Sequence, residues 1–287
     1  MPKDSEPIPE ISEAEATGDI AALYEDLRAS LGIPFVNLIW RHLATIPNGL
    51  AWTWTLLRPL YVSGELERRS AKASELVSLP AVVALPDCVW ESAAVDREAR
   101  QTIVRVIESY DRGNGANFLA LFVARSVLGG GRPAASAAKI ATPEAGSVGP
   151  SPPALPPLPR FSDFPPHVLT LVRRLDQFGR VGDNAAIASL YRHLALWPGF
   201  LSVAYAALEP LHRSGELAKA QAHLIEFGEA QCAELLGLAD RDLPAITAES
   251  RAQMFKSVDE FVRLMIGRMI VMGKAMGLLI PPDGSNR

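Results

Sequence analysis

The sequence predicts an all-α protein built from two similar helical units. Apolar residues recur at helical spacing, and the alternating polar and apolar runs that are typical of half-buried strands are essentially absent. The chain also repeats itself, since Trp40-Arg41-His42-Leu43-Ala44 returns as Tyr191-Arg192-His193-Leu194-Ala195. Ser63-Gly64-Glu65-Leu66 returns as Ser214-Gly215-Glu216-Leu217 at the same spacing of 151 positions. Two linked copies of one helical unit are expected to pack as an intramolecular pseudo-dimer, with the functional site at the seam between them.

The first repeat is expected to occupy residues 1–128. Ile20, Leu23, Tyr24, Leu27 and Leu31 follow the apolar period of a helix, and Gly32 and Pro34 then end it. Further helices are predicted over 34–45, 48–62, from 63 onward, 98–110 and 117–128. Pro59 is expected to bend the second of these or to close it early.

A linker is predicted over residues 129–160, because this segment begins with three glycines and is rich in proline, alanine and serine. The second repeat then covers 161–287 and repeats the helical pattern. Its helices are predicted over 164–180, 184–196, 199–213, 214–235 and 247–278. Two tryptophans and three methionines of the repeats are expected to belong to the core: Trp52, Trp54, Met265, Met269 and Met272.

Composition limits the function. The chain of 287 residues is 48% apolar and has a formal net charge of −4 with no basic block, which argues against nucleic acid or an anionic membrane as partner. Its two cysteines, Cys88 and Cys232, form no disulfide framework, and the N-terminus lacks the apolar stretch of a secretory signal. We therefore expect a cytoplasmic protein that acts on a small molecule without metal or cofactor, with a protein partner or homodimer left open.

Ordered segments of the chain resemble one enzyme family. In the first half these are Tyr24-Glu25-Asp26-Leu27-Arg28 followed by Leu31, Pro34 and Val36, then Arg41 with Leu43-Ala44-Thr45, Pro47, Gly49 and Leu50, then Gly113-Asn114 at the start of an apolar helix. In the second half they are Leu194-Ala195, Trp197-Pro198 and Leu201. Together these segments resemble the group I, non-stereospecific 2-haloacid dehalogenases over most of the chain.

This resemblance implies an all-α pseudo-dimer in which a carboxylate of the second repeat activates a water. The water displaces halide directly, and an Asn with aromatic residues of the first repeat forms the pocket. The family's pocket Asn corresponds to Asn114, its Trp to Phe35, its Phe to Leu38 and its Tyr to Asn117. The Ser before its catalytic Asp corresponds to Ser189.

The catalytic Asp itself corresponds to Leu190, in a register that Trp197-Pro198 fixes without a gap. Leucine cannot accept a proton or orient a water, so the chain departs from the family at the reacting residue. Asp111 is the first candidate replacement, expected at a helix end facing the site, although an Asp there is also typical of a surface turn. Asp183 shares the helix face of Leu190 if that helix is continuous, but it is more typical of a helix N-cap.

The histidine and arginine pairs of the repeat give further candidates. His42 is predicted as a base and His193 as a substrate contact, and a structural role for both stays open. Arg41 and Arg192 are suited to hold an anionic group, although repeated arginines often form structural ion pairs instead.

The sequence therefore leaves three alternative functions. The first is displacement at an sp3 carbon by the substrate's own amine or hydroxyl, with loss of sulfate or halide and closure of a small ring such as an aziridine in specialised metabolism. Asp111 and His42 would then be catalytic, with substrate contacts from Asn114, Asn117, Phe35, Leu38, Arg41, Ser189, Leu190 and His193. The second is a hydrolytic 2-haloacid dehalogenase with a relocated Asp, and the third is a non-catalytic helper or binding protein of the same fold.

Overall fold

The computed structural model describes residues 8–132, 154–181 and 187–282. In these ranges it is all-helical and contains no strand, as the apolar spacing predicts. No helix of the described part has the length and apolar character that crossing a membrane requires.

The first half of the chain folds into helices that agree with most of the predicted spans. They are α1 (Gly18–Leu31), α2 (Leu38–Leu43), α3 (Gly49–Val62), α4 (Glu65–Leu76), α5 (Asp87–Ser92) and α6 (Arg97–Leu128). Pro59 lies inside α3 and does not end it. The short α5 was not predicted from the sequence, and α2 begins later than predicted because Asn37 is extended.

One prediction for this half is wrong, because a single helix, α6, replaces the two helices expected at 98–110 and 117–128. Gly113 and Gly115 do not break it. A Cβ on Gly113 would lie 2.9 Å from Cδ1 of Ile33, and one on Gly115 would lie 2.9 Å from Cβ of Ser70. These glycines therefore let the segment before α2 and helix α4 approach α6 closely.

The second half holds a similar series of elements. They are η1 (Phe161–Asp163), α7 (Pro166–Leu175), α8 (Ser189–Leu194), α9 (Pro198–Ser214), α10 (Glu216–Leu235), η2 (Leu236–Leu238), α11 (Ala248–Glu260), the π-helical η3 (Phe261–Ile266) and α12 (Gly267–Leu278). The last three follow one another without a break and form one long helical rod. The predicted start of a helix at 184 lies outside the described residues.

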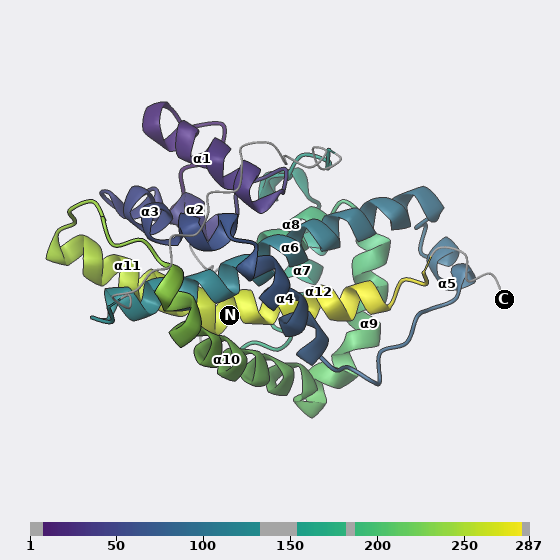
Figure 1. Cartoon of the computed structure of the whole chain (residues 1–287). Coiled ribbons are helices and arrows are strands. Elements are labelled where there is room, and N and C mark those ends of the chain that lie inside the picture. Colours follow the sequence, from purple (N-terminus) through teal and green to yellow (C-terminus); the bar gives the residue numbers. More distant parts are fainter. Residues whose placement is uncertain (1–7, 133–153, 182–186, 283–287) are drawn as a thin grey trace.

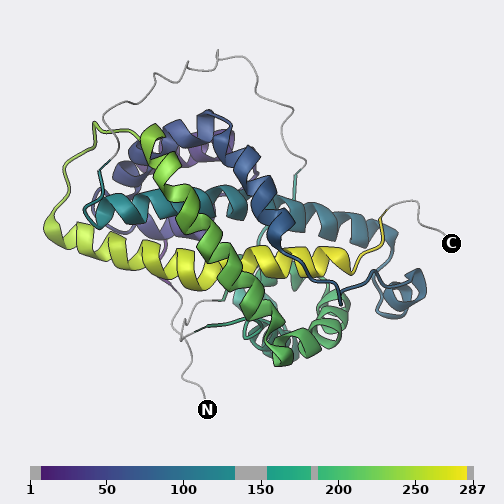
Figure 2. The same cartoon turned by 60° about the horizontal axis from the view of Figure 1, so that its bottom comes forward.

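The two long helical rods pack side by side at the centre of the molecule (Figure 1). They are antiparallel, because Arg125 near the end of α6 pairs with Asp259 in the first part of the other rod, whereas Asp111, earlier in α6, faces Gly273 near the end of that rod. Helices α1 to α3 cover one side of this pair, and α10 crosses α12 on another (Figure 2). The core includes Trp52 and Trp54, each 2% exposed, as expected.

Candidate active site

A small cavity of about 40 Å³ lies between the two halves of the chain. The first half contributes residues of α2 and α6, and the second contributes residues of α8, η3 and α12. The lining consists of Asn37, Leu38, Ile39, Tyr110, Asn114, Asn117, Ala188, Ser189, Leu190, Phe261, Met265, Ile266 and Met269. We call this space the seam cavity.

Most of the lining residues form pairs at the spacing of the sequence repeat. Asn37 and Ala188, Leu38 and Ser189, and Ile39 and Leu190 are each 151 positions apart. The same spacing relates Tyr110 to Phe261 and Asn114 to Met265. The cavity is therefore bounded by equivalent positions of the repeat, with more polar groups on the side of the first half.

Asn117 is completely buried and has a fixed amide orientation. Its Oδ1 accepts hydrogen bonds from Nε1 of Trp40 at 3.0 Å and from the hydroxyl of Tyr61 at 2.7 Å. Because the indole N–H of Trp40 can only donate, the accepting atom of Asn117 must be the oxygen. Nδ2 of Asn117 is then left as a buried donor without a partner in the described structure.

Two further asparagines of the lining carry unpaired buried atoms. Nδ2 of Asn114 and Oδ1 of Asn37 have no hydrogen-bond partner in the described part of the chain, and both side chains are buried. A buried polar group without a partner costs about 1–3 kcal/mol, so such groups mark a place where a ligand or water can bind.

Leu190 lines the seam cavity and is 1% exposed. Its neighbour Ser189 also lines it, and Oγ of Ser189 accepts a long hydrogen bond of 3.5 Å from Nη2 of Arg41. None of the lining residues is acidic. The described lining residues therefore offer amides and hydroxyls but no carboxylate that could deprotonate a water.

The two repeat histidines lie beside the cavity, and neither lines it. His42 stacks on Phe261, with ring centroids 6.0 Å apart, while Nδ1 contacts the carbonyl of Pro9 and Nε2 contacts Oγ of Ser257, each at 2.8 Å. Both ring nitrogens of His42 are thus engaged in contacts between elements.

His193 makes the equivalent ring contact from the other repeat, edge-on to Tyr110 at 5.9 Å. Its Nε2 contacts the carbonyl of Pro156 at 2.7 Å, and burial lowers the pKa of the ring. Phe35 packs against the same Tyr110, with centroids 4.6 Å apart, so it supports the lining without belonging to it.

The two repeat arginines lie close to the seam. Arg41 is 6% exposed and forms an ion pair of 3.0 Å with Glu10. Arg192 lies 5.3 Å from the ring centroid of Phe161, and burial followed by the like charge of Arg41 lowers its pKa. Nε of each guanidinium is buried without a hydrogen-bond partner in the described structure. Two positive charges therefore converge beside Ser189.

Asp111 does not occupy the predicted place. It lies in the middle of α6, not at a helix end, and it is not part of the cavity lining. It faces α12 at Gly273, and burial raises the pKa of its carboxyl to about 7, with Lys274 opposing the shift and Glu108 adding to it. Asp183, the other candidate base, lies outside the described residues.

Sequence reasoning missed several lining residues, chiefly Asn37, Tyr110 and Phe261. The repeat spacing leads from Tyr110 to Phe261 and from Asn114 to Met265, so the spacing was a usable signal for the second wall. Met265 and Met269 were expected only as core residues and in fact also line the cavity. Within the described ranges, no three His, Cys, Asp or Glu side chains are grouped closely enough to hold a metal ion.

No protein-family model matches this sequence, and no curated protein matches it. Solved structures do match over almost the whole chain. A D-2-haloacid dehalogenase with L-LA has a TM-score of 0.77 at 18% identity, covering 94% of this chain and 95% of that one. A mutant D-2-haloacid dehalogenase with D-2-CPA has a TM-score of 0.75 at 18% identity and covers 95% and 96% of the two chains.

A further D-2-haloacid dehalogenase mutant has a TM-score of 0.74 at 19% identity, covering 93% of this chain and 94% of that chain. At this level of identity the comparison concerns the backbone arrangement, since a fold can host unrelated functions. The chain has the helical fold of these D-2-haloacid dehalogenases.

Proposed function

We propose that the seam cavity binds a small substrate and promotes nucleophilic displacement at an sp3 carbon, from which a halide or sulfate departs as an anion. The proposal rests on the polar atoms that line the cavity. Nδ2 of Asn114 and of Asn117 are buried donors without partners, and no lining residue is acidic. Donors held in a dry site stabilise negative charge that develops on a leaving group.

The proposal includes the pseudo-dimer. Helices α2 and α8 begin 151 positions apart, and so do α6 and α11, so the repeat extends to the long rods. The ring contacts also come in equivalent pairs, because His42 with Phe261 and His193 with Tyr110 differ by the same spacing. An approximate two-fold relation of this kind accounts for a cavity bounded by both repeats.

The nucleophile is proposed to come from the substrate. With Leu190 in the lining, no described side chain there can activate a water. A substrate amine needs no activated water. Once its ammonium form has lost a proton to solvent, the nitrogen lone pair forms the new C–N bond while the bond to the leaving group breaks. The leaving group takes the bonding electrons, and the nitrogen then loses a second proton to solvent, giving a small ring such as an aziridine. Asp111 and His42 take no proton in this scheme.

The arginines favour a substrate that carries a negative charge. Arg41 reaches Ser189, and Arg41 and Arg192 lie close enough that one lowers the pKa of the other. Glu10 pairs with Arg41, so the three groups together leave a net positive charge, and an anion beside Arg192 would be stabilised. A carboxylate or sulfate next to the reacting carbon meets this condition.

The size of the cavity supports a second candidate, a non-catalytic helper of the same fold. About 40 Å³ is far below the 300–1,000 Å³ of ordinary ligand sites. Catalysis therefore requires either a very small substrate or an opening of the seam, whereas a helper protein requires neither.

The test uses two kinds of substrate with the full chain. Serine O-sulfate carries an amine, a carboxylate and a sulfate leaving group, and both enantiomers of 2-chloropropionate report ordinary hydrolysis. We expect aziridine-2-carboxylate from the first above the uncatalysed rate, and no halide release from the second. Asn114→Ala should reduce ring closure at least tenfold, whereas Arg213→Ala, a 74% exposed side chain on α9, should leave it unchanged.

The other outcomes distinguish the alternatives. Halide release by the unmodified chain would overturn the proposal in favour of a hydrolytic dehalogenase, in which a relocated Asp activates the water. Turnover of neither substrate would favour the helper. Leu190→Asp is expected to create halide release if the cavity retains the geometry of a hydrolytic site, with Leu190→Asn as its uncharged control.

A further inference from the structure

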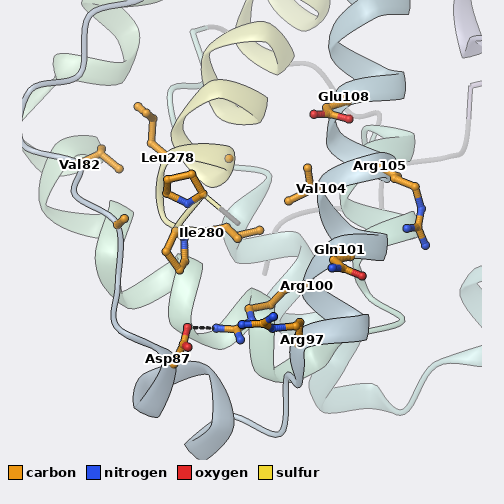
Figure 3. Close-up of a pocket in the computed structure, with 14 residues that line it drawn as sticks. Val82, Asp87, Arg97, Arg100, Gln101, Val104, Arg105, Glu108, Leu278 and Ile280 are labelled. Atoms are coloured by element: carbon orange, nitrogen blue, oxygen red, sulfur yellow. Dashed lines mark hydrogen bonds and ion pairs between the residues drawn. The ribbon is translucent and has the colours of Figure 1, made fainter. Parts of the chain in front are cut away.

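A second and much larger cavity lies at the far end of the two rods (Figure 3). It has a volume of about 790 Å³ and is bounded by the first turns of α6, the end of α12 and the connection that leads into α5. We call it the end pocket. The two linings share no residue. Glu108 of the end pocket and Tyr110 of the seam cavity lie on nearly opposite sides of α6, because two residues turn a helix by about 200°.

The walls of the end pocket are tied to one another. The backbone N–H of Leu85 donates to the carbonyl of Leu279 at 2.9 Å, which joins the α4–α5 connection to the end of α12. Arg100 of α6 forms an ion pair of 2.6 Å with Asp87 of α5. Trp90 anchors α5 by stacking on Phe200 of α9, with ring centroids 5.5 Å apart. The pocket is thus built from fixed elements.

Arginine side chains from the N-terminal part of α6 line one part of the end pocket. Arg97 and Arg100 lie together near Asp87, whereas Arg105 extends from the other side of α6 (Figure 3). Arg100 is paired with Asp87, whereas Arg97 and Arg105 form no ion pair in the described part of the chain, and Arg105 donates only to the hydroxyl of Thr102 at 2.7 Å. Glu108 is the one other acidic lining residue.

The opposite wall is apolar. Val82, Leu278 and Ile280 line it, and Val104 of α6 adds to it from the side of the arginines (Figure 3). The volume lies within the range of sites for drug-sized ligands and cofactors, which combine apolar walls with a few placed polar groups. A ligand that fits both walls must carry an apolar body and an acidic head.

We propose that the end pocket binds a small amphiphilic anion, meaning a carboxylate, sulfate, sulfonate or phosphate attached to an aromatic or alkyl group. The acidic head lies against Arg97, where charge-assisted hydrogen bonds form, and the apolar body lies against Val104, Leu278 and Ile280. Arg105 lies about 12 Å further along α6 and adds only a long-range attraction. The proposal does not depend on the chemistry of the seam cavity.

The test is a fluorescence titration of the full chain with 8-anilino-1-naphthalenesulfonate, compared with N-phenyl-1-naphthylamine, which has the same rings without the acid. We expect one saturable site for the sulfonate and at least tenfold weaker binding of the neutral amine. Arg97→Ala should weaken the sulfonate about tenfold, because it removes a charge-assisted contact, whereas Arg105→Ala should weaken it less. Val104→Trp should abolish binding by filling the pocket.

Arg68→Ala is the matched control, since it removes the same charge from a 59% exposed position on α4. If Arg97→Ala binds the sulfonate as Arg68→Ala does, the proposal is overturned, and this holds even if Val104→Trp fails to fold. Competition adds a second criterion. Decyl sulfate should displace the probe at least tenfold more effectively than inorganic sulfate, and equal potency would show that the apolar wall contributes nothing.

Discussion

Asp111 of α6 lies against Gly273 of α12 so closely that a Cβ on Gly273 would overlap Oδ1 of the carboxyl. This oxygen is buried and has no hydrogen-bond partner in the described structure. The contact lies where the two long rods touch, between the seam cavity and the end pocket. It therefore couples the packing of the rods to the protonation of one carboxyl.

The first prediction concerns this packing. Gly273→Ala should lower the free energy of unfolding by about 1–3 kcal/mol, because the added methyl group forces a closely packed interface apart. The measurement is the midpoint of urea unfolding. Gly277→Ala on the same helix is the control, since its Cβ would meet only Cγ2 of Ile107 at 3.9 Å and should be neutral or stabilising. Asp111→Ala should rescue Gly273→Ala, and a lack of rescue would contradict the assigned contact.

The second prediction concerns pH. Burial raises the pKa of Asp111 from 3.8 to about 7, so in that interval the folded protein holds a proton that the unfolded chain has released. The stabilisation is complete below about pH 4 and is lost as the pH rises to about 7. Asp111→Asn should remove this loss, which can reach about 1 kcal/mol per pH unit. The check is urea unfolding at several pH values, with the exposed Asp242→Asn as control, and parallel curves for Asp111→Asn and the unmodified chain would refute it.

The third prediction concerns a buried ion pair that supports the second wall of the seam. Nη2 of Arg268 lies 3.0 Å from Oδ1 of Asp176, and both side chains are 1% exposed. The same oxygen accepts a bond of 3.5 Å from the backbone of Ala188, which lines the cavity. Asp176→Ala should cost about 3–5 kcal/mol, because it leaves a buried guanidinium with too few partners.

Chemical unfolding of single and double variants checks this expectation. Adding Arg268→Met to Asp176→Ala should recover much of the loss, since the uncompensated charge is then gone. Glu209→Ala, which breaks an exposed pair with Arg213, should change stability by less than about 1 kcal/mol. Equal losses for the buried and the exposed pair would argue against the described geometry.

The fourth prediction concerns the amide of Asn117. Trp40 and Tyr61 hold its oxygen, so Asn117→Asp keeps these two bonds. At a pH at which the buried acid is ionised, the variant replaces the unpaired donor with an acceptor. Bromide or sulfate should raise the thermal midpoint of the unmodified chain above that in acetate of equal ionic strength, because a bound anion stabilises the folded state. The variant should lose this difference. If it responds like the unmodified chain, the anion does not bind at Asn117.

The sequence predicted the helices well where apolar spacing was long and regular. The spans of α3, α9 and the rod from α11 to α12 agree with prediction within one or two residues. It failed for α6, where two helices were predicted. Gly113 and Gly115 lie between the two predicted spans, and they permit close contacts with Asn37 and Ser70. Such contacts come from distant segments and leave no local signal.

For the site, too, the predictions failed where they depended on contacts from distant segments. The resemblance led to Asn114, Asn117, Ser189 and Leu190, and all four line the seam cavity. The predicted bases Asp111 and His42 do not line the cavity. Whether a side chain reaches a cavity depends on its angle around the helix and on its partners elsewhere in the chain. Ser257 and Pro9 engage His42, and neither is near it in sequence.

The paired positions around the seam cavity have an evolutionary consequence. In a dimer of identical chains, a cavity on the symmetry axis has two identical walls, and every mutation changes both at once. Here Asn114 is matched by Met265, and Leu38 by Ser189. In the proposed pseudo-dimer the two walls belong to different segments of one chain, so each can change alone, and one wall can gain amides while the other stays apolar. A cavity with two different walls can distinguish the two ends of a substrate, whereas a cavity with two identical walls cannot.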